Sequence, residues 1–193
     1  MTAWKNDQVS EAETTEIIRL AREALKCDGD FVELGCYKGD TSLMLAEVIS
    51  GSDKKLWIYD SFEGLPVKSE QDYSEIGKDF KEGELYASKR EVKERFLRAG
   101  MKVPVIKKAW FSDLTEADLP EKIALAFIDG DFYESIRDSL KLVGPWMVPS
   151  GLILVHDYTN EALPGVEKAV DEWNRNKNYK IKRFESLAII KIN

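Results

Sequence analysis

The amino-acid sequence predicts an α/β fold, a Rossmann-like sheet of mostly parallel strands with helices on both faces. Short apolar runs alternate with amphipathic stretches at helical spacing, as in successive βαβ units. Two of the apolar runs, 31–34 and 123–128, stop abruptly on glycine and carboxylate, which is typical of buried parallel strands that present polar groups to a ligand. The last two apolar runs are separated only by Glu185 and Ser186, which predicts a hairpin that closes the sheet with an antiparallel strand.

The elements follow from the spacing of apolar residues. Ile17, Ala21 and Ala24 recur at helical intervals, so we expect a helix over roughly 10–26 with Ser10 as its N-cap. The same reasoning predicts helices over 41–49, 88–99, 135–146 and 166–174, a turn at 149–151, and strands over 31–34, 55–59, 103–106, 123–128, 152–155, 179–184 and 187–192.

One segment departs from this alternation. Residues 67–86 are rich in charged residues and glycine with isolated aromatics, and they are too long for an ordinary connection between a strand and a helix. We interpret them as a lid that is mobile in the free protein and becomes ordered over a ligand. Residues 1–193 otherwise form one expected domain.

Composition narrows the class of protein. The 193 residues carry a net charge of −7, which disfavours general affinity for nucleic acid or for anionic membranes. The chain has two cysteines, Cys27 and Cys36, and no apolar run long enough to span a bilayer. We therefore expect a cytoplasmic protein that acts on a small molecule and can form a homodimer.

The ends of the first two strands predict a nucleotide-type cofactor site. Gly35 and Gly39 flank a turn that lets backbone approach a ligand, and Asp60 ends the next strand, where a carboxylate can accept ribose hydroxyls. Tyr37 stands where a dinucleotide fingerprint has its middle glycine, so a pyrophosphate fits poorly.

Four motifs resemble, in order and spacing, those of the macrocin O-methyltransferase family of class I S-adenosylmethionine-dependent enzymes. They are Glu33-Leu-Gly-Cys-Tyr-Lys-Gly39, Tyr59-Asp-Ser-Phe-Glu-Gly-Leu-Pro66, Ile128-Asp-Gly-Asp-Phe-Tyr-Glu-Ser135 and Val155-His-Asp-Tyr158. The resemblance implies a seven-stranded sheet with an antiparallel last strand, and methylation of a hydroxyl on a sugar or another small molecule.

The resemblance also implies roles for individual residues. Glu33, Gly35 and Gly39 would lie against the methionine part of S-adenosylmethionine, Asp60 on its ribose, and Ser61, Phe62, Ala109 and Trp110 near its adenine; Tyr37 and Asp129 complete the expected cofactor-binding set.

A divalent metal, Mg²⁺ by the family pattern, would bind Asp129, His156 and Asp157, and Asp131 would be a second acid or the general base. A cation on the acceptor oxygen lowers the pKa of that hydroxyl and holds it in line with the sulfonium methyl. The family commonly has two acids where this chain has His156-Asp157. As a ligand, His156 would shift preference toward Mn²⁺ or another transition metal; as a base, it would suit neutral pH.

Two other classes of function stay open from the sequence. One is a NAD-dependent oxidoreductase on a similar sheet, which the missing middle glycine disfavours. The other is a cofactor-binding protein without transfer activity. Its support is His156, together with Phe132, which stands where some metal-dependent relatives carry a His or Lys base.

Overall fold

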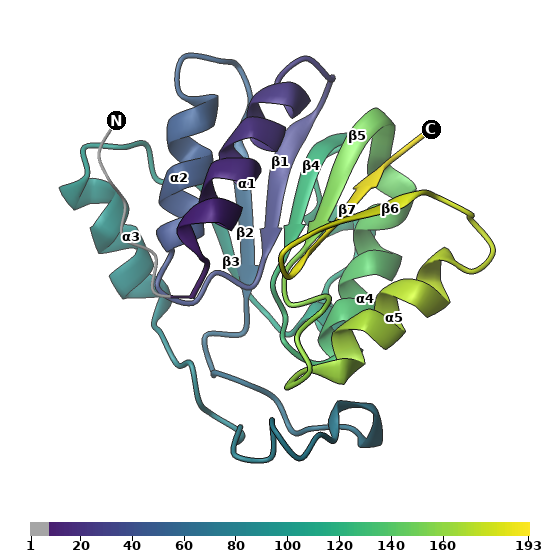
Figure 1. The fold of residues 1–193 in the computed structure, drawn as a ribbon. Coiled ribbons are helices and arrows are strands. Elements are labelled where there is room, and N and C mark those ends of the chain that lie inside the picture. Colours follow the sequence, from purple (N-terminus) through teal and green to yellow (C-terminus); the bar gives the residue numbers. More distant parts are fainter. Residues whose placement is uncertain (1–7) are drawn as a thin grey trace.

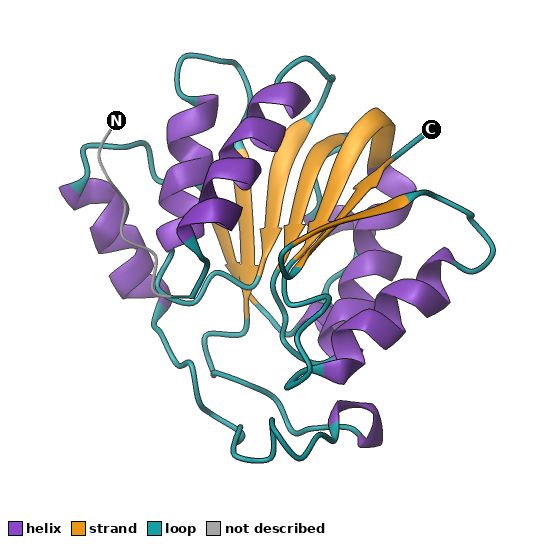
Figure 2. Ribbon diagram, viewed as in Figure 1, coloured by secondary structure: helices purple, strands orange, loops and turns teal. Residues whose placement is uncertain are grey.

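The computed structural model describes residues 8–193, and within that range it forms one seven-stranded sheet with helices on both faces (Figure 1, Figure 2). The strand order is β3-β2-β1-β4-β5-β7-β6, and β7 alone runs antiparallel to its two neighbours. The strands are β1 Asp30–Leu34, β2 Leu56–Asp60, β3 Val105–Lys108, β4 Ile123–Ile128, β5 Met147–Val155, β6 Ile181–Phe184 and β7 Leu187–Lys191. The predicted sheet, including its antiparallel last strand, is confirmed.

Five α-helices lie in the described range, with α1 to α3 on one face and α4 and α5 on the other (Figure 1). They are α1 Glu11–Ala24, α2 Asp40–Ile49, α3 Lys89–Arg98, α4 Tyr133–Val143 and α5 Pro164–Asn174, with short 3-10 turns at Glu70–Asp72, Phe111–Asp113, Glu116–Asp118 and Gly144–Trp146. None of these helices combines the length and the apolar composition that a membrane span needs.

The core explains why the apolar runs form strands. Every residue of β4 is buried, and side chains alternate between the two faces: Ala126 and Ile128 pack with α4 and α5, whereas Leu125 and Phe127 pack with α1 to α3. Because β1 and β4 are adjacent, the chain crosses from one half of the sheet to the other between them. Ligands of such sheets bind at the carboxyl ends of the strands at that point.

Several element boundaries differ from the sequence prediction for local reasons. The turn expected at 149–151 is a bulge inside a longer β5, where Ser150 has a positive φ of 63°. Strand β3 starts after Pro104, which has no N–H to donate to a ladder. Ser10 caps α1, as predicted, and does so in a reciprocal capping box with Glu13.

The segment predicted as a lid runs past the carboxyl edge of the sheet and is attached to the far helices (Figure 1). The buried carboxylate of Asp72 accepts the N–H of Tyr133 at 2.6 Å, at the start of α4, which has no side-chain cap of its own. A Cβ on Gly165, in the first turn of α5, would lie 2.0 Å from the same Asp72 oxygen. Asp72 therefore caps α4 and lies close to the first turn of α5. Its mobility stays a prediction.

Candidate cofactor and metal site

Each of the four central parallel strands is followed by a non-glycine residue in the left-handed backbone region. These residues are Tyr37 after β1, Phe62 after β2, Asp131 after β4 and Asp157 after β5, with φ of 47°, 51°, 58° and 59°. Non-glycine residues adopt this conformation at a cost, and such residues gather at functional sites. The strained positions mark the carboxyl edge of the sheet as the place to look for a ligand.

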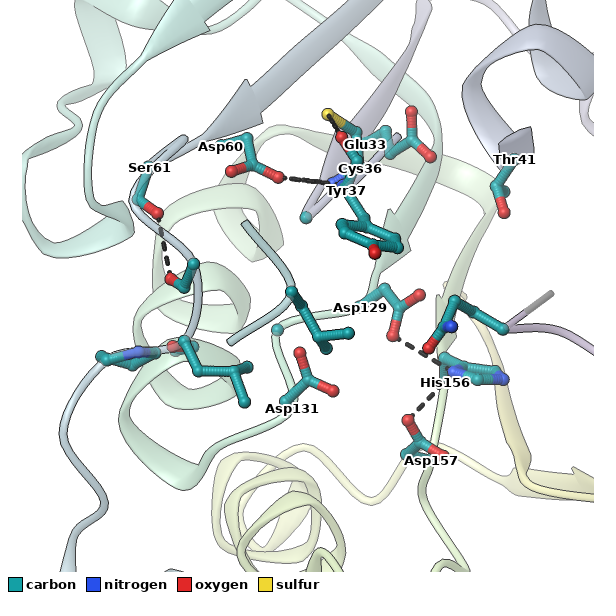
Figure 3. A pocket seen from close by; sticks show the side chains of 18 of the residues that line it. Glu33, Cys36, Tyr37, Thr41, Asp60, Ser61, Asp129, Asp131, His156 and Asp157 are labelled. Atoms are coloured by element: carbon teal, nitrogen blue, oxygen red, sulfur yellow. Dashed lines mark hydrogen bonds and ion pairs between the residues drawn. The ribbon is translucent and has the colours of Figure 1, made fainter. Parts of the chain in front are cut away.

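A cavity of about 250 Å³ opens at that edge (Figure 3). It brings together most of the residues that the sequence singled out: Glu33, Gly35, Tyr37, Asp60, Ser61, Trp110, Asp129, Asp131, His156 and Asp157. Phe111 and, from the predicted lid, Phe80 and Leu85 line it as well. Asn160 and Leu163 also line it, and the sequence reasoning had not assigned these two.

Three of the expected cofactor-binding residues lie outside the lining. Gly39 is the N-cap of α2 and lies against Val92 of α3. A Cβ on Gly39 would lie 3.2 Å from the Val92 side chain. Phe62 is 3% exposed because its ring is part of the core beneath α1 to α3. Ala109 packs against the core on the α4 and α5 side.

The turn after β1 requires glycine for packing. Gly35 has φ 89°, and a Cβ there would lie 1.9 Å from the carbonyl oxygen of Asp129. That contact is between backbones, so a side chain at this position would have to separate the ends of β1 and β4.

Asp60 organises the turns on both sides of it. One carboxylate oxygen accepts the N–H groups of Cys36 at 2.8 Å and Tyr37 at 3.2 Å, and the other accepts the N–H of Phe62 at 2.7 Å. A ribose bound here would donate its hydroxyls to the same carboxylate oxygens that already accept the backbone N–H groups of the glycine turn. The same residue can therefore bind a ligand and shape its site.

Glu33 is a fully buried carboxyl group with one unused oxygen. Oε2 accepts the hydroxyl of Ser42, whereas Oε1 has no hydrogen-bond partner. The pKa of Glu33 is raised to about 8, mainly by burial. The hydrogen bond from Ser42 lowers it, and the charges of Asp129 and Asp60 add to the rise. A buried acid of this kind is suited to a cationic hydrogen-bond donor that enters the cavity.

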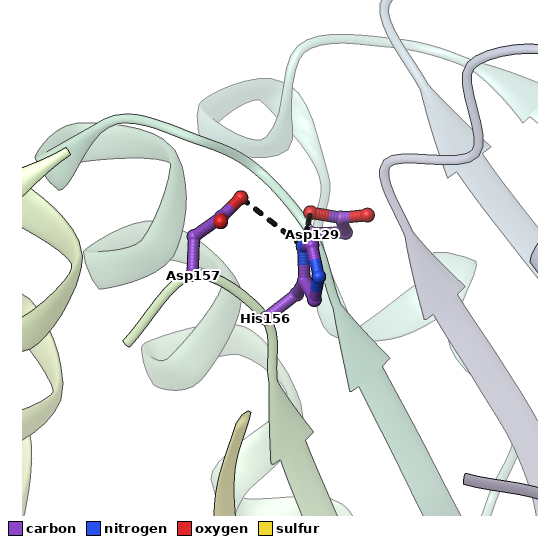
Figure 4. A group of neighbouring side chains, drawn as sticks. All are labelled: Asp129, His156 and Asp157. Atoms are coloured by element: carbon purple, nitrogen blue, oxygen red, sulfur yellow. Dashed lines mark hydrogen bonds and ion pairs between the residues drawn. The ribbon is translucent and has the colours of Figure 1, made fainter. Parts of the chain in front are cut away.

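Asp129, His156 and Asp157 form a group whose possible metal-ligating atoms lie within 4.8 Å of one another (Figure 4). Nδ1 of His156 lies 3.1 Å from an oxygen of Asp129 and 3.1 Å from an oxygen of Asp157. Burial disfavours charge on His156, but the neighbouring carboxylates, Asp129 foremost, outweigh it and raise the pKa of the imidazole. Two hard oxygens and one nitrogen fit a divalent cation.

Asp131 completes the acidic lining. Burial raises the pKa of its carboxyl group well above the usual range, and the charges of Asp129 and Asp157 raise it further. An aspartate with a raised pKa accepts a proton more readily near neutral pH than an ordinary one does.

One buried acid beside this group was missed by the sequence reasoning. Glu13, in the first turn of α1, is 4% exposed and places Oε2 3.7 Å from Nε2 of His156. Its capping-box position beside Ser10 was readable from the sequence, but its approach to the end of β5 depends on how α1 packs across the sheet.

Comparisons with known proteins give one family-model match and several similar proteins. The family model described as Macrocin-O-methyltransferase (TylF) matches residues 13–187. Among curated proteins, the chain is 28% identical over 142 residues to an 8-demethyl-8-(2,3-dimethoxy-alpha-L-rhamnosyl)-tetracenomycin-C 4'-O-methyltransferase of Streptomyces olivaceus, an alignment that covers 69% of this chain and 54% of that protein. The chain thus spans little more than half the length of this relative.

Solved structures show the same fold. The O-methyltransferase NovP superposes with a TM-score of 0.84 and 22% identity over 97% of this chain and 83% of that chain. An O-methyltransferase from Bacillus cereus in complex with SAH superposes with a TM-score of 0.69 and 12% identity, over 98% of this chain and 84% of that one. Since the family model matches well over half of its residues, the chain belongs to the macrocin O-methyltransferase family of class I S-adenosylmethionine-dependent enzymes.

Proposed function

We propose that this protein transfers a methyl group from S-adenosylmethionine to a hydroxyl of a sugar or of another small molecule, with help from a divalent cation. The observation that carries the proposal is the single cavity into which three of the family motifs bring their acids, Glu33, Asp60 and Asp129. The Streptomyces olivaceus relative is named for methylation of a rhamnosyl compound, which supports a sugar hydroxyl as the acceptor.

The polar and aromatic groups that line the cavity suit the parts of S-adenosylmethionine. The unpartnered Oε1 of Glu33 would accept a hydrogen bond from the ammonium group of the methionine part, and Asp60 would accept one from a ribose hydroxyl. Trp110, which is 38% exposed at the rim, and Phe111 offer aromatic surface for the adenine.

S-adenosylmethionine supplies an electrophilic methyl group when bound, and a divalent cation supplies positive charge next to the acceptor oxygen. Asp129, His156 and Asp157 would hold the cation. Asp131, which lines the same cavity, would take the proton of the acceptor hydroxyl. Phe80 and Leu85 would exclude water once residues 67–86 close over the acceptor. A homodimer and a cytoplasmic location stay predictions.

Methyl transfer is the direct test. The protein is incubated with S-adenosylmethionine carrying a labelled methyl group and a panel of glycosylated acceptors, and label on the acceptor is measured by mass spectrometry. Asp129→Asn should lower transfer severely and leave affinity for S-adenosylhomocysteine largely intact, because a charge that acts on the reacting oxygen matters mainly in the transition state. Asp113→Asn, at an exposed position, is the matched control. Label that never reaches an acceptor while the cofactor binds would favour a binding protein.

A further inference from the structure

A second buried acid lies behind the metal-type group, on the other side of the imidazole. Nδ1 of His156 points at Asp129 and Asp157, whereas Nε2 faces Oε2 of Glu13 at 3.7 Å. The two side chains are 6% and 5% exposed. His156 is therefore placed between carboxylates on both of its ring nitrogens.

Glu13 is held firmly in this position by two elements. Its Oε1 accepts the N–H of Ser186 at 2.9 Å and the hydroxyl of Ser186 at 2.5 Å, in the turn between β6 and β7. Its Oε2 accepts the N–H of Ser10 at 3.2 Å, in the capping box of α1. The orientation of the carboxylate is thus fixed before any ligand arrives.

The capping box alone does not explain the burial of this acid. Helix α3 begins with the same box, formed by Ser88 and Glu91, and there the glutamate stays exposed. Burying a carboxylate is costly unless its charge is compensated. At Glu13 the compensation includes the His156 ring, which indicates that the two residues work together.

A carboxylate behind a histidine has a specific effect on the ring. It accepts the hydrogen of the nearer nitrogen, fixes the tautomer and the ring orientation, and makes the other nitrogen a better metal ligand. Here Nε2 faces Glu13 at an ion-pair distance of 3.7 Å, and the nitrogen left for a metal is Nδ1, which lies between the two aspartates.

We propose that Glu13 is a positioning residue that holds His156 as a nitrogen ligand, so that the site prefers a transition-metal ion such as Mn²⁺ to Mg²⁺. The inference rests on the proposed function to the extent that a divalent cation at this site is part of it. Imidazole nitrogen favours transition metals, whereas Mg²⁺ favours oxygen ligands.

The test measures metal binding in the full chain with Mn²⁺ alone as the probe. Free Mn²⁺ is followed by electron paramagnetic resonance during titration, and coupling to ¹⁴N is followed by electron spin echo modulation. Glu13→Gln should bind Mn²⁺ roughly 10–100-fold more weakly than the wild type. Glutamine can still form the capping box, which limits the damage to α1. Glu11→Gln, an exposed change of the same charge on the same helix, should bind Mn²⁺ like the wild type.

A double-mutant cycle separates positioning from general stability. In His156→Asp the nitrogen ligand is gone, so the ¹⁴N coupling should vanish and the preference should move toward Mg²⁺. Adding Glu13→Gln to His156→Asp should then cost no Mn²⁺ affinity, because Glu13 has no histidine left to orient. A structural role for Glu13 would lower affinity equally in both backgrounds.

Three results would overturn the inference: wild-type protein that binds no Mn²⁺, Glu13→Gln with unchanged Mn²⁺ affinity, or an equal loss in the His156→Asp background. Calorimetry with S-adenosylhomocysteine on the same samples keeps the two proposals apart. With normal cofactor binding, either result on Glu13→Gln removes the role of Glu13 alone, and wild-type protein that binds no Mn²⁺ also removes the cation from the proposed function. Absent cofactor binding contradicts the proposed function itself.

Discussion

Glu33 links cofactor binding to proton release. Its pKa of about 8 means that about nine-tenths of the metal-free protein carries a proton on this carboxyl group at pH 7. An arriving ammonium group stabilises the carboxylate, so the proton leaves as the ligand binds. We expect about 0.9 proton to be released per S-adenosylhomocysteine bound at pH 7. The affinity should rise about tenfold between pH 6 and pH 7, since the ionised fraction rises by that factor.

Titration calorimetry in two buffers with different ionisation enthalpies measures the proton count, and repetition at pH 6 and pH 7 gives the change in affinity. Glu33→Gln should show neither the proton release nor the tenfold change, because its amide does not titrate. Glu121→Gln, an exposed position, should behave like the wild type. A wild-type affinity that is equal at pH 6 and pH 7, or a slope that survives in Glu33→Gln, would refute the reasoning.

The same group affects stability without ligand. Because the folded pKa of Glu33 lies above its ordinary value of 4.5, the neutral form stabilises the fold. Its contribution is complete below about pH 4.5 and is lost as the pH rises through about 8. In denaturant unfolding of the metal-free protein, the free energy of unfolding should fall by on the order of a few kcal/mol over this pH range. In Glu33→Gln this fall should be absent.

Three further changes test the site and its frame. Asp60→Ala removes a carboxylate that holds the glycine turn and would bind the ribose, so calorimetry should show S-adenosylhomocysteine affinity reduced by roughly 1.5–3 kcal/mol; unchanged affinity would exclude this role. Asp72→Ala removes the cap from Tyr133 and should cost about 1–2 kcal/mol in denaturant unfolding, with faster hydrogen exchange in 67–86. Equal exchange of that segment with and without ligands would argue against a lid. Gly35→Ala should destabilise the fold by more than about 1 kcal/mol, which is roughly the backbone cost of such a change without any clash, because the added Cβ would meet a backbone carbonyl at 1.9 Å. Normal stability in denaturant unfolding would contradict the packing described.

Much of the fold was predictable because local patterns and global packing agree. The run 123–128 is apolar at every position, and the structure buries it on both faces as a central strand. Ser10 before an amphipathic run predicts the start of α1, and the two-residue spacing at Glu185 and Ser186 predicts the final hairpin. Each of these signals depends on neighbours in sequence.

The rest depends on contacts between distant segments. Glu13 meets His156 only because α1 packs across the end of β5. Asp72 caps α4 from a segment whose composition indicates only solvent exposure. Phe62 lies in a cofactor motif by sequence, yet its left-handed backbone turns the ring into the core. Such features follow from tertiary packing, which periodicity does not encode.

The most direct test of cofactor binding is a calorimetric titration of the metal-free protein with S-adenosylhomocysteine, with NAD as the comparison. The cavity formed by Glu33, Asp60 and their neighbours predicts one S-adenosylhomocysteine bound per chain and no binding of NAD, because Tyr37 stands where a dinucleotide fingerprint has its middle glycine. Binding of NAD without binding of S-adenosylhomocysteine would contradict the proposed function and favour an oxidoreductase.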